Sequence, residues 1–304
     1  GLGGGKAATS SGRSGGGGGF NIDLRDTHSN IIARSGDAVG TIAFGTDTYD
    51  LYVFDGSNWY FYDYNSTTAF SSTLSGHFDG VNDYVAVTPS STIPLYGFSA
   101  WFKCDSVINK SATKGVALGL TGSNWFLGFG GNFTGTLTDE IISINTGARY
   151  GYCHASEEIA VGWHHAIAVW STSSATNSGG DGYDIWLDGV KVGNQANTDY
   201  GAATLFTIPA SEMRFGERIG AYPYPGLLDE ISIFSSALSD ADVATIYNSG
   251  VPSDLSDLSP AGWWRMGEND SGSNGATIGT VTDQGSGGNN GTGTNGATYS
   301  STTP

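Results

Sequence analysis

Short runs of alternating apolar and polar residues recur along most of the chain, a pattern typical of β-strands with one buried face. In residues 97–105 the apolar side chains take four alternate positions: Phe98, Ala100, Phe102 and Cys104. Residues 162–170 and 226–234 have similar strand character, and 182–193 reads as a hairpin turning at Asp188-Gly189. The pattern predicts an all-β fold of antiparallel strands.

One segment departs from the strand pattern. Residues 237–250, "ALSDADVATIYNSG", have the signals of a short helix. Ser239 is the expected N-cap and Asp242 completes a capping box with it. Gly250 is the expected end of the helix.

The N-terminal quarter divides into two parts. Residues 1–19 are rich in glycine and serine and predict an arm without a core of its own. Residues 20–70 form a second part, in which 40–64 predict a three-strand meander. Its strands are expected at Thr41–Phe44, Asp50–Phe54 and Trp59–Asp63.

Bulky groups occupy both faces of this meander, which is too small to shield two apolar faces. We therefore expect residues of the meander to pack against other copies of the chain or the rest of the protein. The residues expected to make this oligomer or anchor contact are Tyr52, Phe54, Trp59 and Phe61.

The composition narrows the choice of partners. The 304 residues include 48 glycines and only 13% charged residues, which disfavours long helices. The formal net charge of −17 would repel both a phosphate backbone and an anionic membrane. No apolar run approaches the roughly 18 residues of a membrane span. Nucleic acid and membrane are therefore not expected as partners.

Several segments, taken in order, resemble the laminin-G-like, pentraxin-related members of the concanavalin-A-like lectin/glucanase superfamily. They are "FDGVNDYVAV", "FSAWFK", "GWHHAIAVW", "IWLDGVKVG" and "YPGLLDEISIFSSALSDADVATIYN", within residues 72–250. The resemblance implies a two-sheet antiparallel jelly-roll sandwich over 71–304. The meander resembles short β modules of bacteriophage fibre and decoration proteins.

The C-terminal segment is placed unusually for this family. A segment like "GWWRMGEND" usually precedes the "FDG" strand, but here it begins at residue 262. We expect residues 263–300 to complete the sandwich of their own chain, with strand exchange between subunits as the alternative.

The acidic residues suggest one metal site. Asp79 and Asp83 fit a turn with side-chain to backbone hydrogen bonds better than a metal loop. Asp229 shares strand parity with Ile231 and Ile233, so we expect it to face an apolar layer, where a carboxylate needs donors or a cation. The candidate ligands of a single structural Ca²⁺ are Asp229, Asp283 and Asn289, and backbone N–H donors are the alternative.

Catalytic residues are not expected. The glucanase branch carries alternating acidic residues on one strand, E-x-D-x-E or E-x-D-x-x-E, and the sequence has neither. The adjacent acidic pair at 229–230 should point to opposite faces and not cooperate. Aromatic residues that can stack on sugar rings are Trp125, Tyr150, Tyr152 and Tyr222.

These observations favour a non-enzymatic virion structural protein, a capsid decoration or fibre-type component at the virion surface. Its expected partners are copies of itself, with a trimer as the predicted order, a major capsid or tail protein, and cell-surface glycans. The alternative is a secreted, calcium-dependent carbohydrate-binding module.

Overall fold

The computed structural model describes residues 24–35, 37–39, 41–46, 51–54, 57–62, 70–105, 115–120, 126–129, 142–145, 150–153, 159–174, 180–192, 205–218 and 222–304. The chain forms two compact units, Gly1–Ser71 and Ser72–Pro304, which we describe separately. No helix among the described residues is long and apolar enough to cross a membrane.

The first unit contains a four-stranded sheet and one short helix. The sheet order follows the chain: β1 (Leu24–Asp26), β2 (Ile42–Gly45), β3 (Leu51–Phe54) and β4 (Trp59–Tyr62). The three meander strands lie within one residue of their predicted bounds. Two further elements were not predicted: β1, which pairs in parallel with β2, and the helix α1 (His28–Ile32).

The first unit has a small core that corrects the predicted anchor surface. Ile31, Ala43 and Tyr52 are fully buried together, and Trp59 packs against them. Phe54 is also buried and lies 5.2 Å from the Trp59 ring, measured between centroids. Tyr52 and Phe54 therefore do not offer surface to another chain. The side chain of Phe61 lies outside the described residues.

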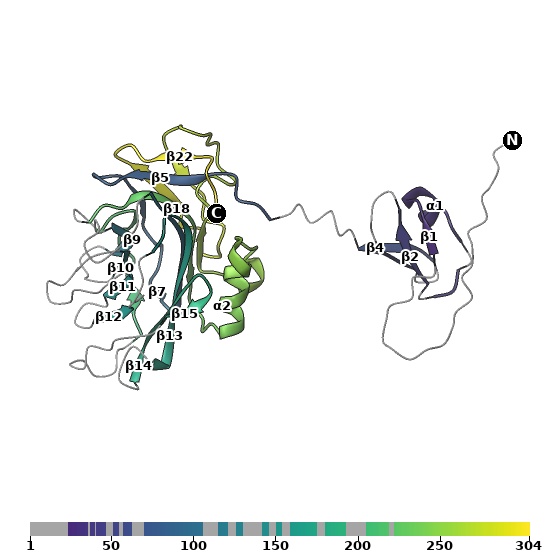
Figure 1. Cartoon of the computed structure of the whole chain (residues 1–304), viewed down its shortest axis with the longest axis horizontal. Helices are drawn as coiled ribbons and strands as arrows, with labels where there is room; N and C mark the ends of the chain where they lie inside the picture. The colour runs from purple at the N-terminus through teal and green to yellow at the C-terminus, as the bar shows by residue number, and fades with distance from the viewer. Residues whose placement is uncertain are drawn as a thin grey trace. The chain divides into compact units, whose positions relative to one another are not determined.

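The second unit is a sandwich of two sheets, each with eight strands among the described residues (Figure 1). The first sheet has the order β12 (Tyr150–Cys153), β11 (Ile142–Asn145), β10 (Phe126–Phe129), β9 (Gly115–Leu120), β17 (Met213–Phe215), β6 (Tyr84–Val87), β21 (Gly291–Thr294) and β20 (Thr280–Val281). All the pairings between these strands are antiparallel.

The second sheet has the order β15 (Val190–Lys191), β14 (Gly180–Leu187), β13 (Gly162–Ser174), β8 (Gly97–Cys104), β18 (Pro225–Phe234), β5 (Ser75–Asp79) and β22 (Thr298–Ser300). Its eighth strand, β19 (Gly262–Trp264), also pairs with β18. A separate two-stranded ribbon joins β7 (Ile93–Pro94) to β16 (Thr207–Ile208). The predicted all-β, antiparallel fold class is confirmed.

The main core lies between the two sheets. Phe98, Ala100, Phe102 and Cys104 all belong to it, as the alternation in 97–105 predicts. Full burial of a large apolar side chain is worth about 1.5–3 kcal/mol, so such residues dominate the stability of the unit. Cys104 carries a free thiol, and burial raises the pKa of this thiol to about 12.

The C-terminal strands take their places in both sheets. β21 pairs with β6, and β22 pairs with β5, so strands from the two ends of the unit lie side by side (Figure 1). Within the chain, the segment at 263–300 thus occupies the positions expected of it.

The helix α2 (Asp240–Tyr247) covers part of the outer face of the second sheet, where Tyr247 stacks on Trp101 of β8. Ser239 and Asp242 form the predicted capping box. The helix ends earlier than predicted, because Asn248 takes the left-handed conformation with φ 45°. Two short 3₁₀ turns follow, Asn248–Gly250 and Ser256–Leu258.

Candidate functional site: a buried carboxylate cluster

A β-bulge in β18 decides where its acidic residues point. Asp229 pairs with Trp101 of β8, but Ser232 pairs with Ser99, so β18 has one extra residue between these pairs. Glu230 has a positive φ of 47° at this point. Leu228 on one side of the bulge and Ile231 on the other both lie in the main core. Such a bulge interrupts the two-residue alternation of a strand.

The bulge corrects two predictions. Asp229 does not share a face with Ile231, because the extra residue shifts the alternation between them. The adjacent acidic pair also does not point apart. Carboxylate oxygens of Asp229, Glu230 and Glu268 lie within 4.8 Å of one another.

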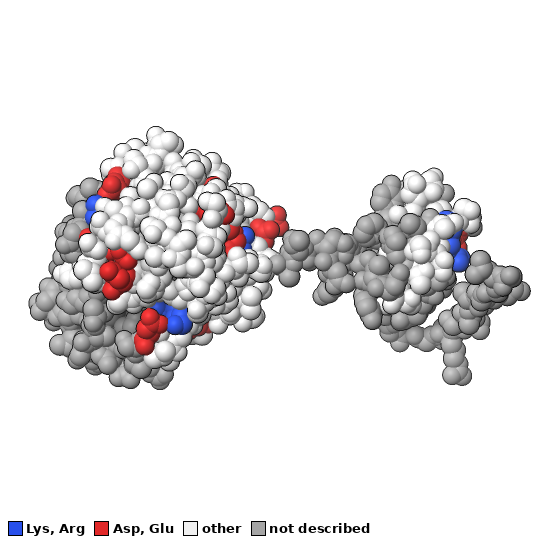
Figure 2. All heavy atoms as spheres, turned by 90° about the horizontal axis from the view of Figure 1, so that it is seen from above, with Lys and Arg blue, Asp and Glu red and all other residues white. Residues whose placement is uncertain are grey.

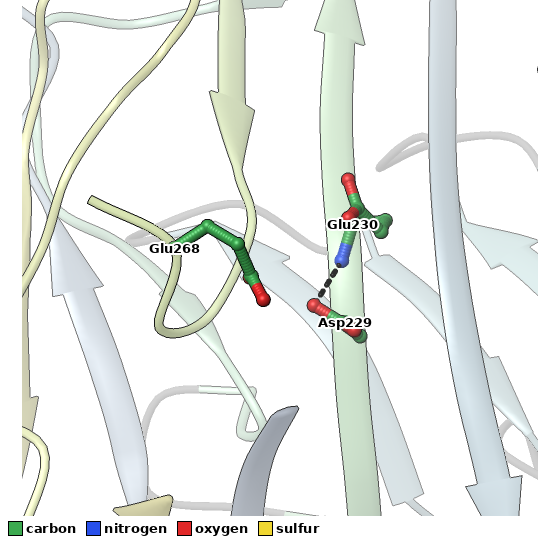
Figure 3. Close-up of side chains that lie close together, drawn as sticks. All are labelled: Asp229, Glu230 and Glu268. Atoms are coloured by element: carbon green, nitrogen blue, oxygen red, sulfur yellow. Dashed lines mark hydrogen bonds between the residues drawn. The ribbon is translucent and has the colours of Figure 1, made fainter. Parts of the chain in front are cut away.

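The three carboxylates meet where β18 changes its neighbour. β18 pairs with β5 as far as Leu228 and with β19 from Ile231. Figure 3 shows Glu268 reaching from a loop toward the strand that carries Asp229 and Glu230. Asp229 is fully buried, and Glu230 is only 3% exposed.

Local donors satisfy part of this cluster. Asp229 accepts hydrogen bonds from the Ser72 hydroxyl at 2.5 Å and from the backbone N–H of Glu230 at 2.8 Å. Glu268 Oε1 accepts from the backbone N–H and the hydroxyl of Thr73. Glu268 Oε2 is buried and has no hydrogen-bond partner. A buried oxygen without a partner lowers the stability of the folded state by about 1–3 kcal/mol unless a donor or a cation reaches it.

Among the described residues, negative charge exceeds positive charge in this cluster. Arg265 donates to Glu230 Oε1 at 2.9 Å and forms an ion pair with that carboxylate. Burial, followed by the charge of Glu230, raises the pKa of Asp229 well above its ordinary value. Burial also raises the pKa of Glu230 to about 7, although Arg265 opposes this shift. The cluster therefore favours uptake of a proton or a cation.

These residues fit a divalent cation. Carboxylate and hydroxyl oxygens are the ligands preferred by Ca²⁺ and Mg²⁺. Glu268 Oε2 is an unpartnered oxygen within such a set, and the Ser72 hydroxyl adjoins Asp229. The residues that could hold an ion are Asp229, Glu230 and Glu268.

Asp283 and Asn289, predicted as ligands together with Asp229, belong to a separate hydrogen-bonded loop. Asp283 accepts from the backbone N–H groups of Trp263, Gly285 and Asn289 at 2.7–2.8 Å. The Asn289 side chain accepts from the backbone N–H of Ser90. The sequence thus indicated one residue of the cluster and missed the other two.

Of the four candidate sugar-stacking residues, the structure describes the side chain of Tyr222 alone. Trp125 and the side chains of Tyr150 and Tyr152 lie outside the described residues. Tyr222 is half-buried, with the Arg218 guanidinium 5.9 Å from its ring centroid.

The predicted turn after β5 is confirmed. Asp79 accepts from the backbone N–H of Val81 at 2.7 Å. Asp83 in turn accepts from the backbone N–H of Asp79 at 3.1 Å. These two carboxylates therefore hold the turn by side-chain to backbone hydrogen bonds, as the sequence predicts.

Comparison with known families agrees with this sandwich. Residues 78–244 match the sequence model of the concanavalin A-like lectin/glucanases superfamily. The match covers more than half of the 304 residues, so the chain belongs to this superfamily. No curated protein matches the chain.

Among solved structures, the chain is similar to a protein of Bacteroides ovatus to which carbohydrate binding is ascribed. The TM-score is 0.53 at 17% identity, over 86% of this chain and 70% of that one, which shows a shared fold.

Two weaker likenesses carry no argument about this chain. One is to the heptameric SAP-like pentraxin of Limulus polyphemus, with 18% identity, a TM-score of 0.39, and 58% of this chain and 82% of that one covered. The other is to domain 4 of an arabinanase from Geobacillus stearothermophilus, solved with arabinotriose. Its identity is 15% and its TM-score 0.35, over 69% of this chain and 82% of that one.

Proposed function

We propose that the Ser72–Pro304 unit binds carbohydrate without cleaving it. The observation that carries this proposal is the membership of residues 78–244 in a superfamily of lectins and glucanases. The likeness in fold to the Bacteroides ovatus protein, to which carbohydrate binding is ascribed, supports the same conclusion.

The carboxylate cluster favours binding over catalysis. A glycosidase needs two carboxyl groups that flank a bound sugar. Asp229 is instead fully buried in the sandwich, and Glu230 is tied to Arg265 and to the indole N–H of Trp263. We therefore assign the cluster a structural role.

A glycan array probed with the whole protein tests this function. We expect retention on at least one class of glycan, with no reducing ends released when the same glycan is incubated in solution. Release of reducing ends would establish an enzyme instead. Failure to bind any glycan on the array or any insoluble polysaccharide would refute carbohydrate binding.

We also propose that Asp229, Glu230 and Glu268 hold one structural Ca²⁺. The proposal is supported by three carboxylates that lie within 4.8 Å of one another, of which Glu230 is paired with Arg265, and by the unpartnered oxygen of Glu268. Calorimetric titration of EDTA-treated protein with CaCl₂ is the test. A flat titration together with an unchanged melting temperature would refute the calcium site.

For the N-terminal unit we propose an anchoring role at a virion surface, with the sandwich displayed outward. The resemblance of residues 40–64 to phage fibre and decoration modules supports this proposal. With Tyr52 and Phe54 inside the unit, the contact would use other residues, such as Val53, which is 43% exposed. The proposed partners are further copies of the chain, as a trimer, and a capsid or tail protein.

Deleting residues 1–66 tests the anchor. Loss of particle attachment, with the sandwich still folded by circular dichroism, is the expected result. Unchanged attachment would remove the anchoring role. Glycan binding by residues 72–304 in a chain that attaches to no particle would favour the secreted, calcium-dependent module. Mass measurement of the intact assembly tests the trimer.

A further inference from the structure

A cavity of about 440 Å³ lies in the C-terminal part of the sandwich unit, bordered by the loop after β19, by β20 and by β22. Its polar lining includes Asn269, Asp270, Ser271, Thr277, Thr280 and Thr282. The volume is within the range of small-molecule sites, about 300–1,000 Å³. The buried carboxylate cluster contributes no residue to this lining.

Asp270 is a fixed acceptor in this cavity. Its Oδ1 accepts from the backbone N–H of Thr282 at 3.0 Å and from the Thr282 hydroxyl at 2.6 Å, which fixes the carboxylate. Its Oδ2 is buried and has no hydrogen-bond partner. A ligand hydroxyl can supply the missing donor, and hydrogen bonds to charged acceptors are stronger than those between neutral groups.

Tyr299 offers a second polar group. Its hydroxyl donates to the Thr280 carbonyl at 3.0 Å and lies beside the Asp270 carboxylate. Burial and the neighbouring Asp270 carboxylate raise the pKa of Tyr299 to about 12, which keeps the hydroxyl protonated. Gly272 packs directly on the ring, and Tyr299 is only 4% exposed. The Tyr299 ring is therefore covered and does not offer a face for stacking.

The charge of the cavity lining limits the class of ligand that it can bind. Among the described residues that line the cavity, Asp270 is acidic and none is a lysine or an arginine. The whole chain carries a formal net charge of −17, and Figure 2 shows acidic patches on one face of this unit. An anionic ligand would meet repulsion here. A neutral ligand with several hydroxyl groups matches both the acceptors and the charge.

We propose that this cavity is a binding site for one neutral hexose unit of a glycan, in which a sugar hydroxyl donates to Asp270 Oδ2. The inference rests on the proposed carbohydrate binding and deepens it by assigning the site and the sugar class.

Two substitutions test the assignment. Gly279 lines the cavity, and a Cβ added there meets no atom within 4 Å, so Gly279→Leu fills space without a clash near the backbone. Asp270→Asn keeps an oxygen for Thr282 but replaces the acceptor Oδ2 by a donor. Asp257→Asn, at an exposed position in a 3₁₀ turn, makes the same change of charge outside the cavity and serves as control.

The probes are the methyl glycosides of glucose, galactose and mannose, and N-acetylglucosamine. Binding of each sugar to the full chain is measured by NMR titration, and a glycan array is probed in parallel. We expect one of these sugars to bind the unmodified protein. Its affinity for Asp270→Asn should be at least about tenfold lower, as expected for the loss of one hydrogen bond to a charged acceptor. Gly279→Leu should abolish binding, while Asp257→Asn retains it. Thermal melting must show that each variant is folded.

The outcomes separate the two proposals. Glycan binding that survives both cavity variants would overturn this site and leave carbohydrate binding intact. Binding of only anionic sugars would overturn the sugar class. No binding to any sugar or array glycan would overturn the site and the proposed function together.

Discussion

Replacing Glu268 by glutamine tests the electrostatic account of the carboxylate cluster. The substitution removes one negative charge and preserves the shape of the side chain. The remaining oxygen can still accept from Thr73, and the new amide group takes the place of the unpartnered Oε2. It can donate toward Asp229 or Glu230, whose oxygens lie within 4.8 Å.

The expected effect depends on calcium. Two ionised carboxylates 4.8 Å apart repel by about 3 kcal/mol at an effective dielectric constant of about 20. Protonation of Asp229 relieves part of this repulsion, because its pKa is raised. We therefore expect Glu268→Gln to increase the free energy of unfolding by about 1–3 kcal/mol in EDTA at pH 8. In excess calcium, the variant should lack the stabilisation that bound metal gives the folded state. This stabilisation is about 2.7 kcal/mol when the free calcium concentration is 100 times Kd.

The pH dependence follows from the raised pKa of Glu230, about 7 against an ordinary 4.5. The folded state holds this proton more tightly, so its contribution is complete below about pH 4.5 and is lost as pH rises through 7. The shift corresponds to about 3 kcal/mol. The charge of Glu268 adds to the pKa shift of Glu230. Between pH 5 and pH 8, Glu268→Gln should therefore lose less stability than the unmodified protein.

Urea unfolding followed by tryptophan fluorescence measures these changes at pH 5 and pH 8, with EDTA or excess calcium. Asp257→Asn, at an exposed position, is the matched control and should leave the free energy of unfolding unchanged under all these conditions. A loss of stability for Glu268→Gln in EDTA at pH 8 would refute the reasoning.

Three further predictions concern the framework. Gly189→Ala should lower the free energy of unfolding in urea by about 1–3 kcal/mol. Gly189 has φ 75°, and a Cβ at this position would clash with the Tyr247 ring. An unchanged urea midpoint would contradict this packing. Asp283→Ala should cost about 2–4 kcal/mol by leaving three backbone N–H groups without their acceptor, and full stability would show that water replaces it. Cys104 should resist thiol reagents in the native protein and react after unfolding, since burial raises its pKa to about 12; rapid native labelling at Cys104 would refute its burial.

The features that the sequence predicted are set by local chemistry. The capping box of Ser239 and Asp242 needs only two side chains one turn apart. The turn at Asp188-Gly189 needs positive φ at both positions, and the structure has 49° and 75° there. The core face of residues 97–105 follows from alternation alone.

The cluster was only partly predictable because it depends on long-range pairing. A positive φ is rare for a glutamate, so residue type gave no sign of the bulge at Glu230. Glu268 meets Asp229 only after β19 has paired with β18. The small core around Tyr52 was missed for a similar reason, since Ile31 comes from a five-residue helix with weak sequence signals.

The pairing of the last strands with β5 and β6 has a consequence for biosynthesis. β5 and β6 leave the ribosome first among the strands of this unit, yet their neighbours β22 and β21 are made last. Until then, both early strands have open edges that can capture strands of other nascent chains. Such distant pairing also slows folding. The protein should therefore depend on chaperones during translation, and premature termination near residue 290 should yield aggregates.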